Sequence, residues 1–185
     1  MPPIHTPVEI ADRLRDVSGR LVALLRTLEP DDWHRPTVSS ERDVKDIARE
    51  YTEKWHHTQQ IFEATSREST ITERRLFHPC LDIFLRALPF TYRAVNAAPG
   101  TLVRVTITGP AGGAWALLRA DEGWLPVTDT DTEPTAHVIL RQNSAWKLFT
   151  RRHDRDTART RFPDIQIEGD IDLGGHVLEM VSVVA

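Results

Sequence analysis

The hydrophobic periodicity of this chain changes once, at Ala97-Ala98-Pro99-Gly100, and that change constrains the fold more than any other feature. Before it, apolar residues recur every three or four positions, which is typical of amphipathic helices. After it, apolar and polar residues alternate, which is typical of strands with one buried face. We therefore predict two domains, a helical domain over residues 1–98 and a small α+β domain over residues 99–185.

The helical half is expected to form an antiparallel bundle of three helices. Pro30 ends the first helix, and Ser40 with Asp43 resembles a capping box at the start of the second. Pro89 predicts a kink or a break in the third helix. The expected helices cover residues 8–28, about 40–65 and 79–95, with loops over 29–37 and 66–75.

The second half is expected to contain strands joined by tight turns, followed by helices. The glycines of Gly109-Pro110-Ala111-Gly112-Gly113 and Asp121-Glu122-Gly123 are typical of such turns. A helix near Asn143 and a closing helix over about 173–183 complete the pattern. Because strands and helices do not alternate one by one, an antiparallel sheet is predicted. The expected strands cover residues 102–107, 114–119, 124–125, 136–141 and 165–167.

The composition indicates a packed protein and argues against two classes of partner. The chain has 185 residues, 40% of them hydrophobic, and a formal net charge of −4. General nucleic-acid binders carry a basic patch and a high pI, so no nucleic-acid partner is expected. No stretch approaches the roughly 18 apolar residues of a membrane span, so no membrane partner is expected either. Acidic residues interrupt one basic cluster, which we interpret as a solvated face; its members are Arg151, Arg152, Arg155 and Arg159.

Cys80 is the single cysteine, so it has no partner for a disulfide within the chain. It follows Pro79 and precedes an apolar run, which indicates a small buried hydrophobe more than a nucleophile. The N-terminal residues lack the basic and apolar segments of a signal peptide. A reducing, cytoplasmic location is therefore expected.

The segment Glu53-Lys54-Trp55-His56-His57 carries the candidate metal ligands. Glu53 and His57 are four residues apart, so on a helix both side chains project from one face and can share a divalent ion such as zinc. His56 points about 100° away from His57 and is not expected to serve the same ion. The alternative interpretation is an exposed polar helix face with a partly buried histidine. Further candidate ligands are His5, His34 and His78.

Several segments resemble the mycothiol-dependent maleylpyruvate isomerase family. That resemblance implies a DinB-like, metal-binding helical domain followed by a domain similar to sterol carrier protein 2. It also implies that Glu53 and His57 descend from metal ligands, that mycothiol is a cofactor, and that the source is actinobacterial. The segments that carry the resemblance are 28–37, 43–48, 50–61, 113–115, 145–150, 168–170 and 173–174.

The chain departs from the family pattern after Ala48. In the family a first metal-binding histidine follows that motif, whereas here Arg49 and Glu50 follow it and the sequence runs directly into what resembles a later helix. An internal part of the helical domain is therefore missing, and one ligand with it.

Two hypotheses follow. The first is a metal-dependent, thiol-using enzyme of the isomerase type, which would convert maleylpyruvate to fumarylpyruvate. The second is a non-catalytic scaffold, or a protein that binds a small apolar ligand, after loss of the metal site. The shortened bundle leaves an apolar face uncovered, so a homodimer is predicted, which would also offer a ligand from the second copy.

Overall fold

The computed structural model describes residues 16–20, 23–24, 26–35, 50–128, 132–151 and 153–182. The chain forms two compact units, Met1–Tyr51 and Thr52–Ala185. In the first unit, residues 16–20 and 23–24 are helical, and a 3-10 helix, η1, covers Pro30–His34. The rest of the first expected helix and the start of the second lie outside the described residues. The three-helix bundle therefore stays a prediction.

A five-stranded mixed sheet is the centre of the second unit. Its antiparallel pairs are β1 with β2, β2 with β3, and β4 with β5, whereas β1 and β4 run parallel. The prediction of a purely antiparallel sheet is therefore wrong. The β2–β3 hairpin extends the sheet on one side of β1, and the chain then crosses to place β4 on the other side. Hairpin turns specify only antiparallel neighbours, so the sequence pattern gave no sign of this crossing. The strands are β1 (Leu102–Thr108), β2 (Gly113–Ala120), β3 (Gly123–Val127), β4 (Ala136–Arg141) and β5 (Gln166–Gly169), in the order β3-β2-β1-β4-β5.

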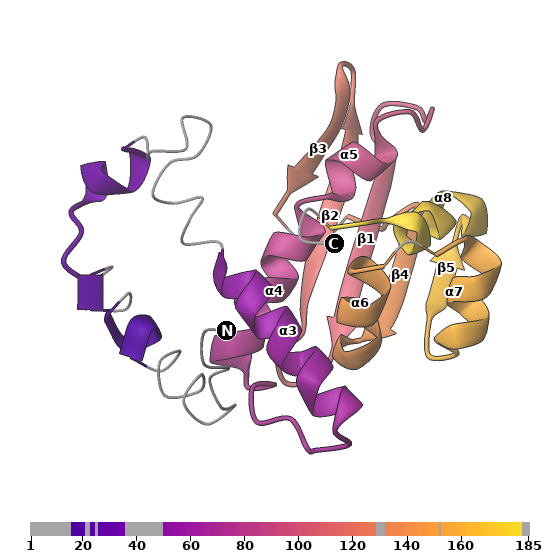
Figure 1. Cartoon of the computed structure of the whole chain (residues 1–185). Coiled ribbons are helices and arrows are strands. Elements are labelled where there is room, and N and C mark those ends of the chain that lie inside the picture. The colour runs from indigo at the N-terminus through magenta and orange to yellow at the C-terminus, as the bar shows by residue number, and fades with distance from the viewer. Residues whose placement is uncertain are drawn as a thin grey trace, which may run out of the picture. The chain divides into compact units, whose positions relative to one another are not determined.

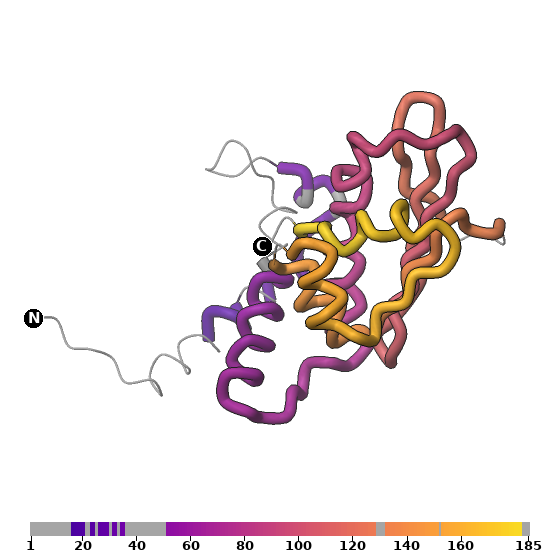
Figure 2. Tube along the Cα trace, turned by 90° about the vertical axis from the view of Figure 1, so that its right-hand side faces the viewer, coloured from indigo at the N-terminus to yellow at the C-terminus, as the bar shows by residue number. Residues whose placement is uncertain are grey.

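Helices cover one face of the sheet. Figure 1 shows α4, α5 and α6 in front of the strands, and Figure 2, turned by 90°, shows α3 and α6 to one side of them. On β1, Val103 and Val105 are buried and Arg104 between them is half-buried, which is the alternation of a strand with one face in the core. The helices are α3 (Glu50–Ala64), α4 (Arg74–Leu85), α5 (Leu88–Tyr92), α6 (Gln142–Phe149), α7 (Arg155–Arg161), α8 (Ile171–Gly175) and the 3-10 helix η2 (His176–Glu179).

One hydrophobic core joins residues from both sides of position 98. Trp55 on α3 stacks on Phe77 of α4 with ring centroids 4.2 Å apart, and it meets Trp146 of α6 edge-on at 6.0 Å. Trp124 on β3 donates its indole N–H to the carbonyl oxygen of Val95 at 2.9 Å. The two compact units meet between residues 51 and 52, and the domains 1–98 and 99–185 stay a prediction. Separate family origins for the two expected domains stay a prediction.

The third expected helix is broken where Pro89 predicted, but it begins earlier than Pro79. It forms α4 from Arg74 and then α5, with Pro79 inside α4. A proline there removes one backbone hydrogen bond. Complete burial of Phe77 and Phe84 on either side of it offsets that cost.

The C-terminal helices also differ from expectation. The closing helix is interrupted, because α8 ends at Gly174-Gly175 and continues as the 3-10 helix η2. Helix α7 is an additional element, which begins where the Asp154 carboxylate accepts from the backbone N–H of Thr157 at 2.9 Å. Among the described residues, no helix is long and apolar enough to cross a membrane.

Candidate functional site

The two predicted metal ligands lie on α3, and both are exposed. The helix is continuous over both residues, so their four-residue spacing places them on one face, as expected. The His57 Nδ1 atom lies 3.1 Å from Oε1 of Gln60. Within the described part of the chain, no group of three or more histidine, cysteine or acidic residues is close enough to hold a metal ion. Glu53 and His57 therefore offer two ligands there, whereas a catalytic zinc site has about three from the protein.

The three candidate third ligands have different surroundings. His5 lies outside the described residues, and His34 belongs to η1 in the first unit. His78 on α4 places Nδ1 2.9 Å from the carbonyl oxygen of Ala111, and its ring stacks on Trp115 at 5.6 Å. These contacts give His78 a packing role against the β1–β2 turn. Metal binding by Glu53 and His57 stays a prediction.

His56, the neighbour of the predicted ligand, is buried with 6% of its surface exposed. Its ring meets Trp146 edge-on at 5.7 Å, and its Nε2 atom is buried without a hydrogen-bond partner in the described part of the chain. Burial lowers the pKa of His56, and the nearby positive charges of His57 and Arg151 lower it further. The partly buried histidine of the alternative interpretation is thus His56.

Cys80 is fully buried on α4, and its thiol lies 3.5 Å from the carbonyl oxygen of Leu76. Burial raises the pKa of the Cys80 thiol to about 12. The thiol therefore stays protonated near neutral pH, and protonated thiols are poor nucleophiles. The prediction of a buried hydrophobe at this position is confirmed.

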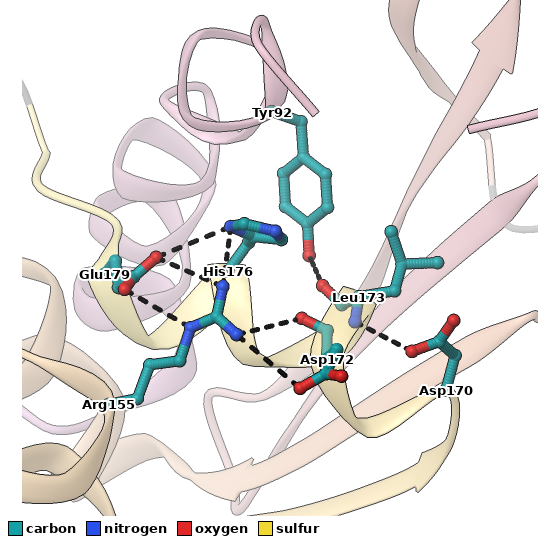
Figure 3. A network of polar contacts seen from close by, with 7 residues as sticks. All are labelled: Tyr92, Arg155, Asp170, Asp172, Leu173, His176 and Glu179. Carbon is teal, nitrogen blue, oxygen red and sulfur yellow. Dashed lines mark hydrogen bonds and ion pairs between the residues drawn. The ribbon is translucent and has the colours of Figure 1, made fainter. Parts of the chain in front are cut away.

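The basic cluster that contains Arg155 was predicted to be a solvated face, but Arg155 itself makes contacts within the chain. Its side chain is 29% exposed and reaches from α7 to η2, where Nε lies 3.2 Å from the Glu179 carboxylate and Nη2 lies 2.9 Å from Nδ1 of His176. A guanidinium can only donate, so the imidazole accepts in this pair. Figure 3 shows the same side chain reaching the backbone carbonyl of Asp172. The one sequence signal that could have pointed to this contact is the i, i+3 spacing of His176 and Glu179, but the arginine lies 21 residues from His176.

A second polar contact beside Arg155 fixes α8 to α5. Tyr92 is fully buried, and its hydroxyl donates to the carbonyl oxygen of Leu173 at 2.7 Å (Figure 3). The Asp170 carboxylate accepts from the backbone N–H of Leu173 at 2.9 Å. A hollow of about 390 Å³ next to this network is bordered by Asp170 and His176. The contacts of this network join α5, α7, α8 and η2.

An apolar groove lies between α4, α5 and the β2–β3 hairpin. Its volume is about 180 Å³. Trp115 forms part of its wall, and the indole N–H of Trp115 donates to the Asp82 carboxylate at 3.2 Å. Asp82 also forms an ion pair with Arg86 at 3.2 Å. These two are the charged residues of the lining. We call this feature the hairpin groove; its residues are Asp82, Leu85, Arg86, Leu88, Pro89, Trp115, Ala116, Leu117, Pro126 and Val127.

No protein-family model matches the chain, and no curated protein matches it. Among solved structures, the chain is similar to the sterol carrier protein 2 (SCP2) domain of the ubiquinone synthesis protein UbiJ, with 17% identity, a TM-score of 0.36, and coverage of 55% of this chain and 85% of that one. It is also similar to sterol carrier protein domain 2 of Helicoverpa armigera, with 14% identity, a TM-score of 0.38, and coverage of 62% and 98%. Sterol carrier protein 2 like 2 of Aedes aegypti has 14% identity, a TM-score of 0.36, and coverage of 58% and 98%.

With TM-scores of 0.36 to 0.38, these similarities carry no inference about the fold, the ligand or the function of this chain. The α+β architecture rests instead on the observed strands and helices. The DinB-like and isomerase parts of the resemblance stay predictions.

Proposed function

We propose that this chain is a non-catalytic module that binds a small apolar molecule in the hairpin groove. The observation that supports the proposal is the composition of the groove wall, in which eight of the ten lining residues are apolar or aromatic. Small-molecule sites are concave, mostly apolar, and carry few polar groups. The proposal rests on this groove and not on the names of the similar structures.

Parts of the groove wall are conformationally restricted, which favours binding. Pro89 at the start of α5 and Pro126 on β3 have fixed φ angles. The hydrogen bond to Asp82 fixes the indole of Trp115. A pre-formed wall lowers the ordering cost of binding. The groove volume of about 180 Å³ is below the roughly 300–1,000 Å³ of typical ligand sites, so a single ring or a short aliphatic chain is the expected ligand.

The test is a titration of the full chain with two uncharged probes, toluene and n-hexanol, observed through the indole N–H resonance of Trp115. Pro126→Trp should abolish the saturable shift, because position 126 lies at the exposed edge of the groove and the added ring fills it. Leu125→Trp is the matched control. Leu125 is 54% exposed and its side chain points to the opposite face of β3, so the same bulk is added outside the groove.

The proposal predicts a saturable shift for wild type and for Leu125→Trp, and none for Pro126→Trp. Equal binding by all three proteins would contradict it, as would the absence of any saturable shift in wild type. Thermal unfolding of each variant verifies that the sheet is intact.

The metal-dependent, mycothiol-using isomerase remains the second proposed function. The observation that favours it is the placement of Glu53 and His57 on one exposed face of α3. Zinc held there would stabilise a bound thiolate. Metal content decides between this function and the non-catalytic one.

A further inference from the structure

Two neighbouring hollows run along the junction of α3, α6 and α7. They have volumes of about 310 Å³ and 330 Å³. Four residues border both of them, so the two hollows adjoin on the second unit; these are Glu63, Asn143, Trp146 and Lys147. We call the two hollows together the α6 groove. Its first part is also lined by Ser144, Arg151, Arg161 and Phe162.

The charges in this first part do not balance. Glu63 is its one carboxylate, and that carboxylate forms an ion pair with Lys147. Nearby Asp164 accepts from the Ser144 hydroxyl at 2.7 Å and from the Arg141 backbone N–H at 2.9 Å; both donors are neutral, so its negative charge offsets one of the cations without pairing with it.

Two guanidinium groups of this hollow have no carboxylate partner among the described residues. Within the described ranges, neither Arg151 nor Arg161 forms an ion pair or a side-chain hydrogen bond. In the same unit, Arg86 pairs with Asp82, and Arg155 pairs with Glu179. Other exposed arginines of this unit, such as Arg159, also lack an ion pair among the described residues, so Arg151 and Arg161 stand out because they line one hollow together.

Aromatic rings beneath the groove hold its cations in place. Lys147 Nζ lies 5.6 Å from the ring centroid of Trp146, and the Arg161 guanidinium lies 6.0 Å from that of Phe162. Both distances are within the range of cation–π attraction, which limits the freedom of these long side chains. Trp146 and Phe162 are themselves 4% and 5% exposed, so they form a fixed floor.

The indole N–H of Trp146 is an unused donor. The other three tryptophans of this unit, Trp55, Trp115 and Trp124, each donate their indole N–H within the chain, at 2.9 to 3.2 Å. Trp146 makes no such bond to any described residue, although it borders both hollows.

His153 lies close to the two arginines of the first hollow, and its pKa reports their positive charge. Its ring meets Phe162 edge-on at 5.8 Å. Burial lowers the pKa of His153, the charges of Arg161 and Arg151 lower it further, and the Asp154 carboxylate partly opposes them.

We propose that the α6 groove binds a small organic oxyanion, with Arg151 and Arg161 as its principal contacts and the Trp146 indole as an additional donor. Guanidinium groups match the geometry of phosphate and carboxylate oxygens, and charge-assisted hydrogen bonds to them are strong. The site is separate from the hairpin groove, which is lined by different residues, so either proposal can fail without the other.

The test is isothermal titration calorimetry on the full chain with phenyl phosphate and benzoate, and with benzyl alcohol as the uncharged comparison. Saturable binding of either anion, without binding of the alcohol, is the expected result. The anion that binds more tightly identifies the phosphate or the carboxylate as the preferred group.

Arg161→Gln should weaken anion binding by about tenfold or more, because it removes a charge-assisted hydrogen bond. Arg159→Gln is the matched control: Arg159 is exposed on the same helix α7, carries the same charge, and does not line the groove. It should weaken binding by less than about twofold. Trp146→Phe keeps an aromatic floor, removes the N–H, and should also weaken binding.

Two results would overturn the proposal. One is the absence of saturable binding of both anions at millimolar concentration. The other is equal weakening by Arg159→Gln and Arg161→Gln, which would mean that only the general charge of α7 attracts anions. Arg161 is exposed, so its substitution is compatible with folding, and thermal unfolding of the variants controls for that.

Discussion

Substitution of Tyr92 tests whether the helices before position 98 and the sheet after it unfold together. Tyr92 is fully buried on α5, and its hydroxyl donates to the Leu173 carbonyl at 2.7 Å, 81 residues further along the chain. Its ring also lies edge-on to Trp124 at 5.0 Å and to His176 at 5.6 Å. If one core holds both segments, damage at Tyr92 must lower the stability of the sheet.

The expected loss of unfolding free energy depends on which contacts each variant removes. Tyr92→Phe removes one hydrogen bond but keeps the ring, and the Leu173 carbonyl still accepts from the His176 backbone N–H. We therefore expect a loss of about 1 kcal/mol, and a fall in Tm of roughly 3–5 °C for a unit of this size. Tyr92→Leu also removes the aromatic contacts and leaves a partial cavity, so its expected cost is about 2–4 kcal/mol.

The assay is thermal unfolding, followed in parallel by circular dichroism and by tryptophan fluorescence. Phe90→Leu is the control, because Phe90 lies on the same short helix but is 66% exposed. Its effect should stay within about 0.5 kcal/mol. The reasoning is refuted if Tyr92→Leu leaves the unfolding of the strands unchanged, or if the two signals report separate transitions in wild type. Either result would support the predicted domain boundary at 98/99.

Three further predictions concern the thiol, the metal and the assembly. Cys80 should not react with an aromatic disulfide reagent at pH 8 until denaturant is added, because burial raises the pKa of its thiol to about 12; rapid reaction of the folded chain would show that the thiol is accessible. Elemental analysis after purification without chelator should find zinc well below one ion per chain, because Glu53 and His57 offer two ligands among the described residues. Stoichiometric zinc that disappears in His57→Ala would instead support the isomerase-type function. Analytical ultracentrifugation should give twice the chain mass of 21.0 kDa if the predicted homodimer forms, and a mass of one chain would disprove it.

The strands were predictable from sequence because alternation is a local property. The expected strand over 136–141 coincides with β4, and the turn at Gly109–Gly113 joins β1 to β2 as expected. The parallel pairing of β1 with β4 was not predictable in the same way, because it depends on where the chain goes after the hairpin. Helix ends were harder as well, since Pro79 reads as a helix start but lies inside α4.

The candidate sites also differ in whether they depend on local spacing or on the packing of distant segments. The shared face of Glu53 and His57 follows from helical spacing alone, so the sequence was sufficient to predict it. The contact of Arg155 with His176 depends on packing of α7 against η2, and no spacing rule predicts it. The α6 groove combines Glu63 of α3 with residues of α6 and α7, which are brought together only by the fold.

The hydrogen-bond donors of the α6 groove are a stronger indication of ligand binding than Glu53 and His57 on α3. Glu53 and His57 are exposed, so water satisfies them and the absence of a protein partner carries little information. Arg161 is exposed as well, so the stronger indication is the Trp146 indole, which has no hydrogen-bond partner among the described residues; Trp146 borders the hollow, in a unit whose other indoles all have partners. Leaving donors unpaired in a concave site lowers stability unless a ligand or ordered water completes them. An oxyanion satisfies several of these donors at once, whereas a metal ion would be repelled by the same cations. Zinc at α3 and an anion in the α6 groove are therefore separate expectations, and the metal and calorimetric measurements test each of them.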